Sequence, residues 1–249
     1  MSTLQKAFAI IEATVSDQGN GLSFSEVVSQ TGTPKASAHR ILKELVEIGV
    51  LAYAADTGRY RGSLKLAALG AEVTANSGLR DHVRPHLQEL NRETKHTCHL
   101  GILNGEVGVY LDKFESHDYG IKLFSEVGKS FPLYCTGLGK ALLAFADPGD
   151  VDRILARPMQ RITAKTRTDP ARIKEALAEA REQGYTVDDE EITRGVMCVA
   201  APIFGVGGEV VGAISATFPS YIESDRGIET EIEAVTRHAS AISGAMEKG

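Results

Sequence analysis

The chain has 249 residues, of which 43% are hydrophobic and 24% charged, and this composition excludes a mainly disordered or fibrous protein. Its formal net charge of −6 argues against a uniformly basic nucleic-acid coat, but it is compatible with a small DNA-binding module in an acidic chain. Three widely spaced cysteines predict neither a disulfide framework nor a zinc ribbon. No apolar run approaches the roughly 20 residues that span a bilayer. We therefore expect a cytoplasmic protein without a membrane partner.

The charge is unevenly distributed along the chain. Residues 1–62 hold six basic and six acidic residues, so residues 63–249 carry the whole deficit of six negative charges. Within the first segment, residues 35–61 have five basic and three acidic residues, an excess of two positive charges. This modest asymmetry is compatible with a DNA-reading head on an acidic body, but does not by itself demand one.

Two helices are predicted at the start of the chain. Five apolar residues with helical spacing predict an amphipathic first helix and its buried face: Leu4, Ala7, Phe8, Ile11 and Val15. Ser23 and Glu26 then form a capping-box pattern, which predicts the start of a second helix. That helix is short, because Gly32 ends it, and it would bury Val27 and Val28.

A third helix is predicted a few residues later, because Thr33 is a good N-cap and Pro34 suits a first helical position. Two short helices joined by a tight glycine turn predict a helix-turn-helix. Its apolar arc comprises Ala38, Ile41, Leu42, Leu45, Val46 and Ile48. Its opposite arc comprises Ser37, His39, Arg40, Lys43, Glu44 and Glu47, with Lys35 at the N-terminal flank. The basic start of this arc suits a major-groove helix, whereas the alternative is an ordinary solvated face.

A hairpin follows the third helix. Two β-prone runs, Val50–Tyr53 and Arg59–Arg61, flank Asp56-Thr57-Gly58, and a hairpin directly after a helix-turn-helix is a wing. Arg59 and Arg61 alternate along the second run, so both would point to one face and contact phosphates or the minor groove. The expected DNA-binding residues are Thr33, Lys35, Ser37, His39, Arg40, Lys43, Arg59 and Arg61.

From residue 64 onward the pattern predicts an α+β domain with helices on one side of its strands. The expected elements are two helices around a break at residues 75–78, strands at 97–103, 107–114 and 121–124, helices from Gly137 and from Asp169 to Gly184, strands at 196–204 and 210–217, and a helix over 228–246. Asn104-Gly105 is a tight-hairpin signal between the first two strands. The last helix is expected to pack on its own sheet.

The motifs that would carry catalysis are missing or incomplete. Residues 137–141 lack the hydroxyl residue and the first glycine of a phosphate-binding loop. On a strand His96 and Cys98 would share one face while His99 points to the other, so the three cannot chelate one ion. We therefore expect no metal, no cofactor and no catalytic residues.

Several stretches resemble the IclR-type bacterial transcription regulators, in order and at family-like spacing over nearly the whole chain. They are residues 33–42, 56–61, 136–141, 184–191 and 198–202. The resemblance implies a mainly α winged helix-turn-helix domain over residues 1–62 and a linker helix over 63–78 that takes part in dimerisation. It implies a GAF-like α+β effector domain, with an antiparallel sheet, over residues 79–249.

A ligand site is also predicted. Free N–H groups at the start of the helix at Gly137 and Leu138 favour an anion, and Ser215 and Thr217 alternate onto one strand face. The alternative from the residues alone is a set of ordinary core groups. The resemblance implies an effector pocket for a small carboxylate or aromatic acid, lined by Leu123, Gly137, Leu138, Asp188, Val196, Cys198, Ser215 and Thr217.

The leading hypothesis is an effector-responsive, sequence-specific transcriptional regulator of a metabolic, and specifically catabolic, operon. It would bind pseudo-palindromic double-stranded operator DNA as a homodimer or a dimer of dimers. Two alternatives remain open. One is an enzyme that acts on a small acid with Cys198 or Cys135 as nucleophile. The other is a protein-interaction module whose helix-turn-helix no longer binds DNA.

Overall fold

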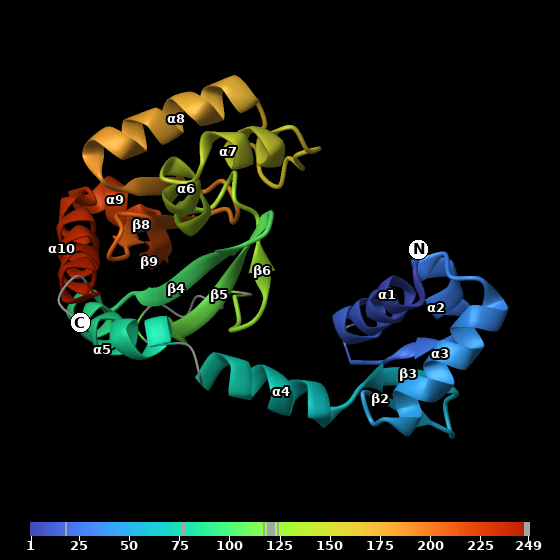
Figure 1. The fold of residues 1–249 in the computed structure, drawn as a ribbon. Helices are drawn as coiled ribbons and strands as arrows, with labels where there is room; N and C mark the ends of the chain where they lie inside the picture. Colours follow the sequence, from blue (N-terminus) through green and yellow to red (C-terminus); the bar gives the residue numbers. More distant parts are fainter. Residues whose placement is uncertain (18, 76–77, 117, 119–122, 124, 247–249) are drawn as a thin grey trace. The chain divides into compact units, whose positions relative to one another are not determined.

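A computed structural model describes residues 1–17, 19–75, 78–116, 118, 123 and 125–246 (Figure 1). The chain divides into two compact units, residues 1–76 and 77–249, each with its own contacts. Among the described residues, no helix is long and apolar enough to cross a membrane.

The first unit is a winged helix-turn-helix, as predicted. Its elements are α1 (Thr3–Ser16), β1 (Leu22–Ser23), α2 (Phe24–Thr31), α3 (Lys35–Glu47), β2 (Leu51–Ala54), β3 (Arg59–Gly62) and α4 (Leu64–Ala75). The capping box of α2 is present, with the Ser23 hydroxyl accepting from the Glu26 N–H and the Glu26 carboxylate accepting from the Ser23 N–H. Ile10, Val27 and Leu42 lie in the core that joins the three helices.

The buried face of α1 differs from the prediction. Leu4 and Phe8 are 75% and 65% exposed, whereas Ile10 and Thr14 are buried. Thr14 is accommodated because its hydroxyl donates to the carbonyl of Ile10 at 2.8 Å. The helix carries apolar residues on two stripes, so periodicity alone could not choose between them.

The N-cap of α3 was also predicted wrongly. Pro34 occupies that position and makes no side-chain cap. Thr33 is buried instead, and its hydroxyl accepts from the Thr31 hydroxyl at 3.0 Å. The prediction missed β1, a two-residue strand that pairs with β3 and makes the wing a three-stranded sheet in the order β1-β3-β2.

The second unit is an α+β fold with one antiparallel sheet. Its elements are α5 (Gly78–Thr94), β4 (Thr97–Asn104), β5 (Val107–Phe114), β6 (Ser130–Phe131), α6 (Gly137–Ala144), α7 (Pro148–Leu155), α8 (Pro170–Gln183), β7 (Thr186–Asp189), β8 (Val196–Phe204), β9 (Val210–Pro219), α9 (Tyr221–Arg226) and α10 (Glu229–Met246). The six strands have the order β6-β5-β4-β9-β8-β7. Asp169 caps α8 and Gly184 ends it in the left-handed region, as predicted.

Helices cover both faces of this sheet, which corrects the expectation of helices on one side (Figure 1). One core joins the sheet to α5 and α10 and contains Met197, Val199 and Ala201. The other joins it to α6, α7 and α8 and contains Ala200. Strand β8 is buried over nearly all its length because successive side chains enter the two cores in turn.

Four short elements of this unit were not predicted: α7, β6, β7 and α9. The strand predicted at 121–124 falls mainly outside the described residues, and Leu123, the one position described there, is not in a strand. The strands predicted around Asn104-Gly105 and around residues 205–208 are present and antiparallel.

Candidate functional site

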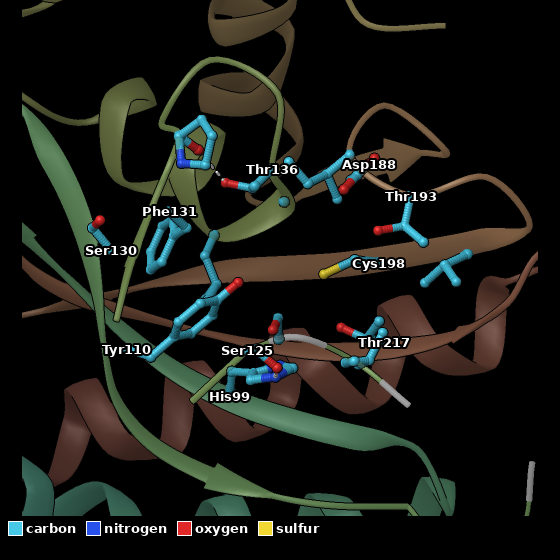
Figure 2. Close-up of a pocket in the computed structure, with 17 residues that line it drawn as sticks. His99, Tyr110, Ser125, Ser130, Phe131, Thr136, Asp188, Thr193, Cys198 and Thr217 are labelled. Carbon is cyan, nitrogen blue, oxygen red and sulfur yellow. Dashed lines mark hydrogen bonds between the residues drawn. The ribbon is translucent and has the colours of Figure 1, made fainter. Parts of the chain in front are cut away.

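A cavity of about 200 Å³ lies in the second unit, between the sheet and the start of α6 (Figure 2). All eight residues predicted to bind an effector line this cavity. The prediction missed nine further lining residues: His99, Tyr110, Ser125, Ser130, Phe131, Pro132, Thr136, Ile192 and Thr193. Of these, His99 could have been found, since strand alternation places it opposite the core residue Cys98.

Strand register brings the predicted polar residues together. Asp188 of β7 pairs with Cys198 of β8, which pairs with Thr217 of β9, so the three form a row across the sheet. Ser215 lies two residues from Thr217 on the same face and pairs with His99 of β4. Residues that are up to 118 positions apart in sequence thus meet on one face of the sheet through pairing alone.

The start of α6 forms the opposite wall. The Thr136 hydroxyl accepts from the Gly139 N–H at 3.0 Å, which leaves the N–H groups of Gly137 and Leu138 without a partner inside the helix. A Cβ on Gly137 would lie 2.9 Å from the Cys198 sulfur, so only glycine lets the helix begin directly against β8. The free N–H groups and the helix dipole favour an anionic ligand group here.

Asp188 is the acidic group of the cavity. It is 2% exposed, and burial raises its pKa from 3.8 to about 7, although Lys140 and the N–H of Glu191 oppose the shift. The Glu191 N–H donates to the Asp188 carboxylate at 2.7 Å. Behind it, the Lys140 ammonium pairs with the Glu191 carboxylate, so this buried cluster carries one negative charge when Asp188 is ionised.

Ser215 and His99 are two of the other polar residues that line the cavity. The Ser215 hydroxyl is buried and makes no hydrogen bond of regular geometry with the described residues; it interacts with the sulfur of Cys198, a weak acceptor. His99 is bonded through Nε2 to the Ser125 hydroxyl at 2.7 Å. Burial, together with the charge of Lys113, lowers the pKa of His99 to about 3, so its ring is neutral at physiological pH.

An aromatic wall closes the side of the cavity formed by β5 and β6. The ring centres of Tyr110 and Phe131 are 4.5 Å apart, and the His99 ring lies tilted against Tyr110 with the centres 5.1 Å apart. Phe131 lies on the backbone of Gly108, where a Cβ would overlap with its ring. The glycine therefore sets the position of this wall.

The cavity does not have the chemistry of a cysteine enzyme. Burial raises the pKa of Cys198 to about 11 and that of Cys135 to about 12, so both thiols stay protonated and are weak nucleophiles at neutral pH. Among the described residues, no group of three or more potential metal ligands comes together. His96, one of the three residues considered for a metal, is bonded to Glu231 at 2.9 Å instead.

The residues of the helix-turn-helix that were predicted to bind DNA differ in their exposure. Lys35, His39, Arg40 and Lys43 of α3 are exposed, and Ser37 is half-buried. Arg40 and Lys43 each pair with an acidic residue one turn further along α3, pairs that are weak in water and can open. Thr33 is buried and cannot offer its hydroxyl to a ligand without a rearrangement.

The two wing arginines also differ. Arg61 is exposed, and its side chain forms no hydrogen bond or ion pair with any residue that the structure describes. The Arg59 guanidinium is half-buried and bonds to the Glu26 carboxylate and to the Gly21 carbonyl. The side chains predicted to share one face thus have different surroundings.

Comparisons with known proteins assign both units. Residues 3–55 match the family model of the IclR helix-turn-helix domain, and residues 71–244 match the model of the C-terminal domain of the bacterial transcriptional regulator IclR. The transcriptional regulator BhcR of Paracoccus denitrificans is 35% identical over 91% of this chain and 81% of its own. KdgR of Escherichia coli is 32% identical over 99% of this chain and 93% of its own.

A solved structure agrees in both units. A putative IclR transcriptional regulator from Silicibacter sp. TM1040 superimposes with a TM-score of 0.86 and 27% identity, over 99% of this chain and 96% of that one. The matching families and the relatives are transcriptional regulators and not enzymes. This finding rejects the alternative of an enzyme with a cysteine nucleophile. The chain belongs to the IclR family of DNA-binding bacterial transcriptional regulators.

Proposed function

We propose that this regulator controls a catabolic operon in response to a small carboxylate that binds in the cavity of the second unit. The ligand carboxylate would accept hydrogen bonds from the free N–H groups of Gly137 and Leu138. Ser215 and Thr217 would orient its other oxygen atoms, with Asp188 as hydrogen-bond partner of a ligand hydroxyl. Leu123, Val196 and the aromatic wall would cover the apolar part.

One observation carries the effector proposal. The Ser215 hydroxyl is buried, lines the cavity and makes no hydrogen bond of regular geometry with the described residues; its interaction with Cys198 is with a sulfur, which is a weak acceptor. Buried hydroxyls almost always make a good hydrogen bond, so one that makes none of regular geometry in a cavity is best explained by a ligand or water that pairs with it. The volume of about 200 Å³ suits a molecule of metabolite size.

For DNA, we propose that α3 lies in the major groove and that the wing contacts the backbone. Lys35, Ser37, His39, Arg40 and Lys43 of α3 would face the groove. Arg61 would contact a phosphate from the wing. Thr33 could contribute only through its backbone N–H or after a local rearrangement, because its side chain is buried.

We further propose that the chain binds DNA as a homodimer, alone or within a dimer of dimers. Leu4, Phe8 and Val15 share one face of α1 and are more than half exposed. Two large apolar residues of α4, the proposed linker helix, are also strongly exposed: Leu64 and Val73. Exposed apolar faces of this kind are typical of protein–protein contacts. Phe8→Glu should therefore convert dimers to monomers in light scattering coupled to gel filtration.

A gel shift tests the DNA proposal. The probe is the duplex immediately upstream of the chain's own gene, with pyruvate, glycolate or benzoate present or absent. Arg40→Ala and Lys43→Ala should weaken binding and each lower the slope of log affinity against log salt by about 0.9 for every phosphate that the side chain neutralises. Arg172→Ala, an exposed arginine of α8, is the matched control. Wild-type affinity and slope in both α3 variants would show that α3 does not read DNA.

Thermal stabilisation tests the effector proposal. The double variant Asp188→Ala, Ser215→Ala should lose the rise in melting temperature that a bound carboxylate produces, while DNA affinity without ligand is retained. Ser243→Ala, a half-buried hydroxyl of α10 outside the cavity, is the matched control. Loss of both properties in the double variant would indicate a misfolded unit instead of a binding site.

A further inference from the structure

The side chain of Arg59 forms hydrogen bonds within the first unit. Its Nε donates to the Gly21 carbonyl at 2.8 Å, and one terminal nitrogen lies 3.0 and 3.2 Å from the two carboxylate oxygens of Glu26. The two partners lie 38 and 33 residues away in sequence, one just before α2 and the other in its first turn. The guanidinium therefore links the wing to the start of the helix-turn-helix.

The backbone makes the same connection. Arg59 pairs with Ser23 of β1 and, on its other side, with Ala54 of β2. Gly21 has a φ of +70°, and a Cβ there would lie 2.6 Å from the Tyr60 carbonyl oxygen. The segment before α2 thus packs directly on β3, and only glycine permits that approach.

Charge distinguishes the two wing arginines. A guanidinium that is paired with a carboxylate has its charge largely cancelled for a nearby phosphate, and Glu26 would itself repel that phosphate. The N–H and then the hydroxyl of Ser23, followed by Arg59, lower the pKa of Glu26, so this carboxylate stays ionised. Arg61 stands two residues further along β3, exposed and with no such partner among the described residues.

We propose that Arg59 is a positioning residue that ties the wing to α2 through Glu26 and Gly21, and that it acts on DNA through Arg61, which makes the phosphate contact. This inference rests on the proposed function, since it assumes that the wing meets DNA. It reassigns one of the residues that the sequence predicted as a direct contact.

The direction in which Glu26→Gln changes DNA affinity distinguishes a positioning role of Arg59 from a direct contact with DNA. Glu26→Gln removes a negative charge from the DNA-facing unit, so electrostatics alone would strengthen DNA binding. Glutamine can still accept from the Ser23 N–H and so keeps the capping box. If the tie positions Arg61, however, Glu26→Gln must weaken binding.

The experiment is a mutant cycle on the full-length chain. The probe is the labelled duplex that the wild-type chain selects from a random pool, and affinity is measured by fluorescence anisotropy at several salt concentrations. The variants are Glu26→Gln, Arg59→Gln and Arg61→Gln, with each of the first two also combined with the third. Circular dichroism melts identify a temperature at which every variant is folded.

We expect Glu26→Gln and Arg59→Gln each to weaken binding about fivefold per head, the upper end for a partly exposed ion pair. Each should lower the salt slope by about 0.9 per head, as Arg61→Gln does. In the Arg61→Gln background both should have no further effect.

Three results would overturn the inference. Unchanged or tighter binding of Glu26→Gln, together with a lower slope for Arg59→Gln, would make Arg59 a direct contact. Equal losses with and without Arg61 would indicate a general effect on folding. Wild-type affinity and slope in all single variants would remove the wing from the interface. If the wild-type chain selects no duplex, the proposed function fails instead, and this is evident before any variant is made.

Discussion

Asp188 gives a prediction whose size follows from the structure. Its pKa in the folded chain is about 7, against the ordinary 3.8, because burial disfavours its charge. Between pH 3.8 and about pH 7, Asp188 is protonated in the folded chain and ionised in the unfolded chain. The stability that protonated Asp188 contributes is therefore complete below about pH 4 and is lost as pH rises through 7. The loss amounts to about 4 kcal/mol, because a pKa difference of one corresponds to about 1.4 kcal/mol.

Asp188→Asn keeps the shape and still accepts from the Glu191 N–H, but it cannot ionise. The variant should therefore be more stable than the wild type by about 4 kcal/mol at pH 8 and by only about 1 kcal/mol at pH 4.5. For a unit of this size, the difference at pH 8 corresponds to a rise of about 8–16 °C in melting temperature.

The chain has no tryptophan, so unfolding is best followed by far-ultraviolet circular dichroism and calorimetry. Melting the wild type and Asp188→Asn at pH 4.5, 6 and 8 measures the difference directly. The reasoning would be refuted if the variant were destabilised, or if its advantage were the same at all three pH values. An advantage that grows with pH would mean that the regulator tolerates a destabilising acid in its cavity, as functional sites often do.

Three further predictions concern the surroundings of the cavity. Lys140→Met leaves the buried Glu191 carboxylate without its ion-pair partner and should cost about 3–5 kcal/mol in urea unfolding, which Glu191→Leu in the same chain should largely restore. Gly108→Ala places a Cβ where it overlaps with the Phe131 ring and should cost about 1–3 kcal/mol, part of which Phe131→Leu should recover; no loss would show that the wall moves freely. Ser215→Ala removes a hydroxyl whose interaction with Cys198 is with a weakly accepting sulfur, so stability without ligand should stay within about 0.5 kcal/mol while carboxylate affinity in calorimetry falls. A large loss of stability in that variant would mean that the hydroxyl is already paired.

Local patterns were reliable where one signal had one reading. The capping box of Ser23 and Glu26, the proline start and glycine end of α8, and the Asn104-Gly105 turn are all present, because each depends on residues that are close in sequence. The face of α1 was misjudged because Leu4 and Phe8 are as apolar as the residues that are buried. Which apolar stripe becomes core depends on the helices that pack against α1, and the sequence of α1 alone does not specify them.

The candidate effector site shows the same division. The family resemblance pointed to eight residues, and strand alternation accounted for the shared face of Ser215 and Thr217. Neither of them predicted the aromatic wall, because Phe131 lies on a strand of only two residues, which is too short to show a periodic pattern. The sequence is equally silent on whether the Ser215 hydroxyl makes a hydrogen bond of regular geometry with the described residues.

The negative net charge, which first argued against nucleic acid, belongs to residues 63–249. The sequence by itself established that residues 1–62 are neutral overall, with five of their six basic residues on α3 and the wing. It also determined the class of fold and the family, because those depend on local patterns and ordered motifs. Only the tertiary structure decided which cations are available. Arg59 and Arg61 have the same charge and the same strand, but Glu26 and Gly21 reach only the first of them. Partners that lie more than thirty residues away meet through strand pairing and packing, and no local pattern specifies such a meeting.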